Sequence, residues 1–323
     1  MTTTRALFAA KGDKPRRSAR DRTRTRAFFL FIAPWLIGFI ALSVIPLVLG
    51  FGVSLTNYDG LNLSTVRFVG PDNYTRAFRD PDVLFSLGRT LLWSVLNTPS
   101  WLLVSFLMAL ILNQKVKGQG FFRTLFYLPT VIPVVASVWI WKIVLDQNFG
   151  LLNAAISLFQ PGTATGWLTS YALQGLTVIA VWGGLGGGMV IFLAGLQNIP
   201  SELIDAARID GAGALSIFRH VTLPLMSPVI FFQLVMALIS SFQQLVLPML
   251  LAPGAAGGLF APPRGTYLYM IHVYRQMFTN LRYGYGTALL WLLFIVVVVL
   301  TLVVFRTARY WVHYEVSVEG GER

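Results

Sequence analysis

Six apolar segments dominate this sequence and limit the folds that are open to it. A helix needs about 20 mostly apolar residues to cross the hydrocarbon core of a bilayer, and each segment is long enough. Only 12% of the residues are charged, whereas a soluble domain carries about 25%. The sequence therefore predicts an all-α, polytopic membrane protein with six transmembrane helices. These are expected at residues 28–52, 88–112, 124–145, 172–196, 224–248 and 286–308.

Lysine and arginine are distributed unevenly around these segments, and their distribution predicts the orientation. Nine of them fall within residues 1–26, which we expect to be a disordered basic arm. Cytoplasmic segments carry an excess of Lys and Arg, and an arrangement with both termini cytoplasmic places about two thirds of them on that side. The predicted organisation is a cytoplasmic arm at 1–26, a six-helix membrane domain at 27–310 and a cytoplasmic tail at 311–323.

Several functional classes find no support in the sequence. It has no cysteine, and its three histidines lie far apart, so we expect no catalytic site and no metal site. The net charge of +12 follows the expected topology, so nucleic acid is not an expected partner, whereas the lipid bilayer is. The six segments contain no Asp or Glu, although ion-coupled carriers usually need carboxylates there. A secondary carrier is therefore the less favoured alternative to a transport subunit that is driven by another protein.

One polar stretch, SELIDAARIDGAGALSIFRHVTLPL at residues 201–225, interrupts the apolar sequence. Ser201 follows a proline and suits an N-cap, while Glu202 and Asp205 fall in a first turn, where carboxylates complement the helix dipole. Two glycines then allow a sharp turn before a second amphipathic stretch. The pattern predicts a cytoplasmic helix–turn–helix that another protein can approach. The alternative is an amphipathic loop on the lipid headgroups, which its acidic residues disfavour.

This stretch resembles the cytoplasmic coupling loop of binding-protein-dependent ABC importer permeases. The family pattern is Glu-Ala-Ala, three residues, Gly, nine residues and Ile-x-Leu-Pro. Here it reads Asp205-Ala206-Ala207, Gly211 and Val221-Thr222-Leu223-Pro224, with Asp in place of the usual Glu. The resemblance assigns contact with an ATPase to eight residues of the loop at 199–225. They are Glu202, Asp205, Ala206, Ala207, Asp210, Gly211, Leu223 and Pro224.

The resemblance extends over roughly residues 28–310. FVGPDNY at 68–74, GFFRTLFYLPTVIP at 120–133 and YGYGTAL at 283–289 are similar to signatures of the carbohydrate-uptake branch, which includes the maltose and glycerol-3-phosphate permeases. It implies the type I importer permease fold in a bacterial inner (plasma) membrane. The implied partners are a homologous second permease, a cytoplasmic ABC ATPase dimer and an extracytoplasmic solute-binding protein. The implied solute is a sugar or a related polyol or glycerophosphate, with a non-sugar solute as the alternative.

The chain itself has no P-loop pattern, G-x-x-x-x-G-K-[ST], so ATP is expected on the partner subunit. We expect no cofactor and no enzymatic activity in this chain.

Two of the apolar segments carry features of a path for a polar solute. The fourth has five glycines within residues 183–188, and the fifth has SSFQQ at 240–244, whose polar groups are costly in hydrocarbon unless they face protein or water. Helical spacing places the two serines and the second glutamine near one face. The alternatives are close helix packing for the glycines and hydrogen bonds between two permeases for the polar cluster. By the resemblance, the solute-contact positions are Gly183, Gly184, Gly187, Ser240, Ser241 and Gln244.

The second segment contains a further polar group, Asn97-Thr98-Pro99. We expect it to mark a kink, and lining of the solute path is the alternative.

Overall fold

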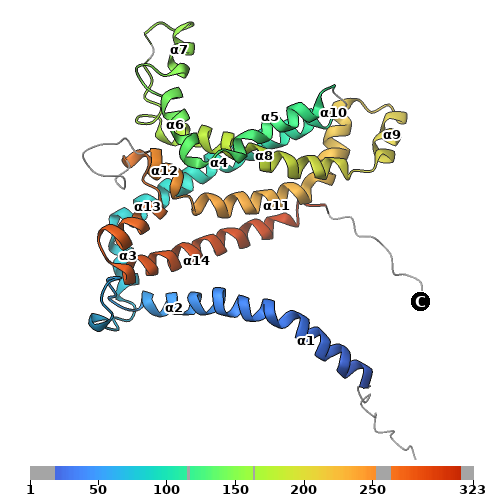
Figure 1. Ribbon diagram of the computed structural model, residues 1–323. Helices are drawn as coiled ribbons and strands as arrows, with labels where there is room; N and C mark the ends of the chain where they lie inside the picture. Colours follow the sequence, from blue (N-terminus) through green and yellow to red (C-terminus); the bar gives the residue numbers. More distant parts are fainter. Residues whose placement is uncertain (1–18, 115–116, 163, 252–262, 314–323) are drawn as a thin grey trace, which may run out of the picture. The chain divides into compact units, whose positions relative to one another are not determined.

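Helices make up almost all of the regular structure of this chain (Figure 1). The computed structural model describes residues 19–114, 117–162, 164–251 and 263–313, and within them the predicted all-α class is confirmed. Five helices of this described part are long and apolar enough to cross a membrane, and there are six spans if two consecutive helices that meet at a bend count as one. Counted in this way, the number of spans equals the predicted six, but several boundaries differ.

The chain divides after Gly52 into two compact units, and the first contains one long helix except for its last two residues. Its elements are α1 (Ala19–Phe39), a π-helical turn (Ile40–Val44) and α2 (Ile45–Ser54). The apolar part of this helix has 28 residues, which gives about 42 Å at 1.5 Å per residue, enough to cross a bilayer. Because α1 begins at Ala19, the end of the predicted disordered arm is helical; residues 1–18 of that arm lie outside the described residues.

The second unit is built around three helices that pack along one another. They are α4 (Pro81–Leu112), α8 (Ala172–Gln197) and α11 (Leu223–Phe242), and α14 (Tyr283–Ala308) packs against α11 and α3 (Asp72–Arg79). At one end of this group the rings of Phe106 and Phe192 lie 5.3 Å apart, and Met226 is fully buried beside them. In lipid, such contacts stabilise the helices through close packing rather than through removal from water.

The third predicted span is broken into two helices. Helices α5 (Gln119–Val131) and α6 (Val134–Val144) meet at 99° across Ile132 and Pro133, so the continuous helix predicted over 124–145 is wrong. A proline ring clashes with an α-helical conformation of the residue before it, and Ile132 accordingly has φ −68° and ψ 128°. Pro133 also lacks the N–H group that would continue the helix.

The fifth span begins and ends earlier than predicted. Helix α10 (Ala214–Ile217), a π-helical turn (Phe218–Thr222) and α11 form one helix of 29 residues. The wider π turn precedes Pro224, where a regular helix would suffer a ring clash and a missing hydrogen bond. The π turn of the first unit likewise ends two residues before a proline, Pro46. After Phe242 the chain leaves the helix, and residues 246–248 belong to the separate helix α12 (Val246–Leu251).

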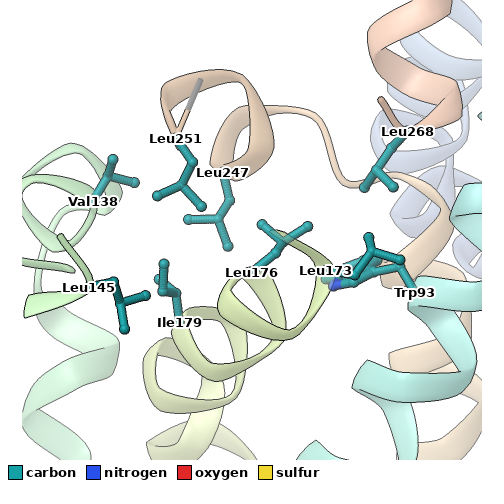
Figure 2. Close-up of a cluster of buried hydrophobic side chains, with 9 residues drawn as sticks. All are labelled: Trp93, Val138, Leu145, Leu173, Leu176, Ile179, Leu247, Leu251 and Leu268. Atoms are coloured by element: carbon teal, nitrogen blue, oxygen red, sulfur yellow. The ribbon is translucent and has the colours of Figure 1, made fainter. Parts of the chain in front are cut away.

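A cluster of buried apolar side chains joins α4, α6, α8 and α12 (Figure 2). In Figure 2, Leu247 and Leu251 of α12 lie over Leu176 of α8, with Val138 of α6 on one side and Trp93 of α4 on the other. The cluster fixes the second half of the broken span, and the segment that follows the fifth span, against α8.

The remaining elements are short. They are a 3-10 turn (Leu63–Thr65), α7 (Leu151–Ser157), α9 (Ser201–Ile209), a 3-10 turn (Arg264–Thr266), α13 (Tyr269–Tyr274) and a π-helical turn (Arg275–Thr279).

Two of the sequence signatures meet in the loop that precedes α3. Asn73 donates hydrogen bonds of 2.8 Å to the carbonyl oxygens of Ser54 and Thr56. Gly284 donates its N–H to the Tyr58 carbonyl at 2.9 Å, and a Cβ on this glycine would lie only 2.0 Å from the Thr56 oxygen. The asparagine of FVGPDNY and the first glycine of YGYGTAL therefore hold the same stretch of chain against the start of α14.

Candidate functional site

A cavity of about 570 Å³ lies where the broken span meets α4, α8, α11 and α12. Its volume is within the usual range of small-molecule sites. The bend forms part of its wall, since the end of α5 contributes Pro129 and Thr130 and the start of α6 contributes Val134 and Ser137. The cavity therefore lies at a discontinuity of the backbone, where helix ends as well as side chains are available to a ligand.

Five of the six solute-path residues predicted from the sequence line this cavity. Gly183 and Gly184 come from α8, Ser240 and Ser241 from α11, and Gln244 from the connection between α11 and α12. The sixth, Gly187, is not among the residues that line it. Two segments separated by more than 50 residues are thus brought to one space, as the sequence predicted.

The glycines of α8 divide into two groups with different surroundings. A Cβ on Gly184 would lie 2.7 Å from Trp101 Nε1, and one on Gly188 would lie 2.6 Å from Trp101 Cζ2. A Cβ on Gly186 would lie 2.8 Å from the Cα atom of Tyr127. At Gly183 and Gly187, by contrast, a Cβ would meet nothing within 4 Å. The first group allows α4 and α5 to approach closely, so the packing interpretation holds for these residues, while Gly183 leaves bare backbone beside the cavity.

The polar residues at the end of α11 also differ from one another. Ser241 is buried, its Oγ lies 2.6 Å from Ser94 Oγ, and it also donates to the Leu238 carbonyl at 2.7 Å. Ser240 is exposed and Gln244 is half-buried. Because α11 ends at Phe242, the predicted helical face that joins Gln244 to the serines is wrong; Gln244 reaches the same cavity from outside the helix.

One wall of the cavity belongs to α4 and was not among the predicted solute-contact positions. Trp93, Asn97 and Trp101 line it, and they lie four residues apart on this helix. Asn97 was expected to mark a kink, with lining of the solute path as the alternative; α4 continues through Pro99, and Asn97 lines the cavity. The regular spacing was visible in the sequence, although tryptophans in a membrane segment also suit contact with lipid or with a packed core.

The polar stretch at 201–225 forms the predicted helix–turn–helix. Helix α9 ends at Ile209, and Gly211 has a φ of +79°, the left-handed conformation that commonly closes a helix. In this turn Ala212 donates its N–H to the Ala207 carbonyl at 2.9 Å. The expected Ser201 cap is wrong, because Pro200 occupies the N-cap position and Ser201 lies within the helix.

The ends of this coupling loop are anchored while its middle is exposed. Ile199 and Phe218 pack into the cluster that contains Phe106, whose ring lies 6.2 Å from that of Phe218. Between these anchors, Ile209 is 86% and Leu215 is 78% exposed. Of the eight predicted coupling residues, Glu202, Asp205, Ala206, Asp210, Gly211 and Leu223 are exposed, and Ala207 and Pro224 are half-buried.

Asp205 forms an ion pair inside α9. Its Oδ1 lies 3.1 Å from an Arg208 guanidinium nitrogen, and both side chains are more than half exposed. An exposed pair of this kind contributes less than about 1 kcal/mol. The carboxylate is therefore held on the loop surface by a contact that a partner can replace at little cost.

A family model described as "binding-protein-dependent transport system inner membrane component" matches residues 102–312. The match includes the coupling loop and the parts of α5, α6, α8 and α11 that line the cavity. The chain belongs to this family of permeases. It is therefore a multi-pass protein of the inner membrane and a transport subunit.

Curated relatives match this permease over nearly its whole length. The probable ABC transporter permease protein YesP of Bacillus subtilis is 35% identical, over 94% of this chain and 97% of its own. The sn-glycerol-3-phosphate transport system permease protein UgpA of Shigella flexneri is 33% identical, over 92% and 99%. AmyD of Thermoanaerobacterium thermosulfurigenes, a probable permease for starch degradation products, is 28% identical, over 85% and 91%.

Solved structures show the same fold. A bacterial ABC transporter that imports the acidic polysaccharide alginate matches with a TM-score of 0.72 and 21% identity, over 90% of this chain and 97% of the matched chain. An alginate transporter in complex with its substrate-bound periplasmic protein matches with a TM-score of 0.74 and 21% identity, over 91% and 98%.

A second polar cluster of the permease lies at the opposite end of α4 from the coupling loop. One Asp80 oxygen accepts a hydrogen bond from the Asp82 N–H at the start of α4, and the other accepts one of 2.9 Å from the Tyr285 hydroxyl. His272 of α13 is buried, and its Nε2 lies 3.6 Å from that second oxygen, too far for a hydrogen bond. Its Nδ1 is 3.0 Å from the Tyr267 hydroxyl. Asp80 thus links the starts of α4 and α14 and lies next to α13.

Burial lowers the pKa of His272, and the neighbouring Asp80 opposes this shift only in part. The imidazole is therefore neutral at pH 7. This cluster was missed because its members are far apart in the sequence, and an isolated histidine gives no signal of its surroundings.

Proposed function

We propose that this permease forms one half of the translocation path of an ABC importer for a carbohydrate or a related polyol. The other half is a homologous second permease, an extracytoplasmic binding protein delivers the solute, and a cytoplasmic ATPase dimer supplies the energy. Both termini face the cytoplasm in this proposal. Support comes from family membership, from the glycerol-3-phosphate and starch-product permeases among the relatives, and from the hydroxyl and amide groups that line the cavity.

The observation that carries the proposal is the continuous connection between the cavity and the coupling loop. Helix α8 runs from Gly183 and Gly184 at the cavity to the start of the loop, and the helix that begins at Ala214 returns from the loop to Ser240. Movement of the loop therefore displaces two walls of the cavity. An ATPase that binds the loop can change the shape of the cavity without contacting the solute.

Asp205 is the residue through which the coupling role is best tested. Asp205→Lys reverses the charge on the exposed surface of α9 and breaks the pair with Arg208. The expected position of Asp205 in the first turn is wrong, since only Glu202 lies there and Asp205 is in the middle of α9. We expect this substitution to weaken binding of the ATPase or to uncouple its hydrolysis from the solute. Asp205→Glu, the matched control, restores the usual family residue and should behave as the parent protein.

The assay combines co-purification of the ATPase with ATPase activity stimulated by the solute-loaded binding protein in proteoliposomes. Normal co-purification together with normal stimulation in Asp205→Lys would leave the loop as a helix on the membrane surface and overturn the proposed coupling role. Family membership favours the importer over an ion-coupled carrier. A non-sugar solute is the alternative within the importer class, and a thermal-shift screen of the binding protein against sugars distinguishes the two.

A further inference from the structure

We propose that three residues of α4, Trp93, Asn97 and Trp101, form a recognition stripe that selects an uncharged, hydroxyl-rich solute. This inference rests on the proposed function and adds two things to it, a third binding wall and the charge of the solute. The relatives leave that charge open, since glycerol 3-phosphate and alginate are anionic and starch degradation products are neutral.

The three residues occupy one face of α4. Positions four apart lie one above the other on a helix, and all three residues line the cavity. The stripe therefore presents the amide of Asn97 and the indole of Trp101 to the cavity, with the buried indole of Trp93 packed behind them. Aromatic faces pack against the C–H surfaces of a sugar ring, while an amide bonds its hydroxyls, so this combination suits a carbohydrate.

Both indoles are held in place by the protein. Trp93 is 1% exposed and belongs to the cluster in Figure 2. Trp101 packs directly against the backbone of α8. Its ring is so close to Gly184 and Gly188 that any side chain larger than hydrogen at either position would collide with it. A site built from side chains that are already fixed loses little conformational freedom when the solute binds. The close packing at these two glycines therefore also fixes the position of the Trp101 ring.

Asn97 lies between the indoles, and the carbonyl oxygen of its amide has no hydrogen-bond partner among the described residues. This oxygen, Oδ1, is buried. Buried polar atoms nearly always have a partner, so an unpaired one in the wall of a cavity points to a ligand that supplies the missing bond. A hydroxyl both donates and accepts, and it can therefore pair with this amide in either orientation of the side chain.

The rest of the wall has the same neutral character. Every described residue that lines the cavity is uncharged, and its polar groups are hydroxyls and amides such as Thr130, Ser137, Ser240 and Gln244. The end of α5 and the start of α6 meet at the wall and carry opposite partial charges, so the bend offers carbonyl and N–H groups together. A phosphate or carboxylate that entered this space would lose water without gaining a cation, which is strongly unfavourable.

The charge preference of the cavity can be measured in the complete importer without knowledge of the solute. The chain has no cysteine, so Ser240→Cys introduces a single thiol into the wall. We would measure the rate at which this thiol reacts with a neutral and with an anionic methanethiosulfonate reagent, and take the ratio of the neutral rate to the anionic rate. This ratio is then divided by the same ratio measured for Asp72→Cys on the surface, which corrects for the different reactivities of the two reagents. We expect the neutral reagent to be favoured by about ten-fold or more. A normalised ratio of one, or one that favours the anionic reagent, would overturn the inference.

A second charge variant tests whether Asn97 faces the same space. In the Ser240→Cys background, Asn97→Asp should slow the reaction of the introduced thiol with the anionic reagent further, by about ten-fold, since two like charges would share one cavity. Ser100→Asp is the matched control, because Ser100 lies on α4 but is not among the residues that line the cavity. Equal effects of the two variants would remove Asn97 from the stripe.

Uptake into proteoliposomes with internal ATP tests recognition of the solute itself. The probes are labelled maltotriose and xylotriose, which are neutral, and trigalacturonate and glycerol 3-phosphate, which are anionic. We expect uptake from the neutral pair alone, with KM raised about five- to hundred-fold in Asn97→Leu. The KM should be unchanged in Thr98→Val, because Thr98 is buried beside the stripe and does not line the cavity. Uptake of an anionic probe would overturn the inference while leaving the proposed function intact. If no probe is transported, the result opposes the proposed function, and the cysteine ratio decides the charge preference.

Discussion

Ser94 of α4 and Ser241 of α11 share a hydrogen bond of 2.6 Å between their buried hydroxyl groups, at the edge of the candidate solute path. The bond joins the second and fifth spans inside one chain. Interhelical bonds of this kind average about 0.6 kcal/mol in membrane proteins. Ser241 is therefore already engaged in packing, whereas Ser240 and Gln244 have polar groups for a solute.

Gln244→Leu should impair transport without loss of the assembled complex. The variant leaves a solute hydroxyl unpaired, which costs about 1–3 kcal/mol and corresponds to a loss of roughly five- to hundred-fold in kcat/KM. Gln243→Leu is the matched control, since Gln243 is the neighbouring glutamine and does not line the cavity. Uptake by the complete importer is the measurement, and equal activities of the two variants would argue against a solute contact at Gln244.

Gly188→Ala should destabilise the permease more than Gly187→Ala. At Gly188 the new Cβ would lie 2.6 Å from the Trp101 ring and 2.8 Å from Ser105 Oγ, whereas at Gly187 it meets nothing within 4 Å. Forced insertion of this kind costs about 1–3 kcal/mol. Thermal unfolding of the purified complex in detergent should show the difference, and a similar loss in both variants would contradict the division of the glycines into two groups.

Single cysteines should report the orientation of the chain, because no native thiol interferes. Cysteines introduced at Asn113 and Arg219 should be shielded from a membrane-impermeant thiol reagent in intact cells. Those introduced at Asp72 and Arg264 should react. Labelling of the first pair alone would reverse the proposed orientation, with the termini outside, and labelling of all four would contradict the span assignment.

Acidification should destabilise the permease through His272. The pKa of His272 in the folded protein lies below the ordinary value of 6.5. At pH values between these two pKa values the unfolded chain therefore binds more protons than the folded protein. The free energy of unfolding should therefore fall as the pH drops through about 6.5, until the folded-state pKa is reached. His272→Gln should reduce this slope, and His313→Gln, at an exposed histidine beside a different pocket, provides the comparison. Identical slopes in parent and His272→Gln would show that the buried imidazole does not carry the effect.

The sequence predicted the features that depend on composition and local pattern. Apolar length was sufficient to locate the spans, and the coupling loop was recognisable because its acidic residues and its left-handed Gly211 leave a local signature. The bend was missed because Pro129 and Pro133 look equivalent in sequence. Only the second breaks the helix, and packing of α6 against α8 and α12 holds the two halves apart.

The wall formed by α4 required tertiary information. The role of Gly184 depends on Trp101, a residue more than 80 positions away, and no single-segment pattern reveals that contact. Likewise, the unpaired state of Asn97 becomes visible only when the neighbours of its amide are known.

The unbroken helix from Ala214 to Phe242 has a mechanical consequence. The helix has 29 residues and is about 40 Å long at a rise of 1.5 Å per residue, so a displacement of one end is transmitted to the other. This helix and α8 both run from the coupling loop to the cavity, whereas the third span is broken at Ile132 and Pro133. In the proposed function, movement of the coupling loop would therefore displace the walls formed by α8 and α11 more than the wall formed at the bend.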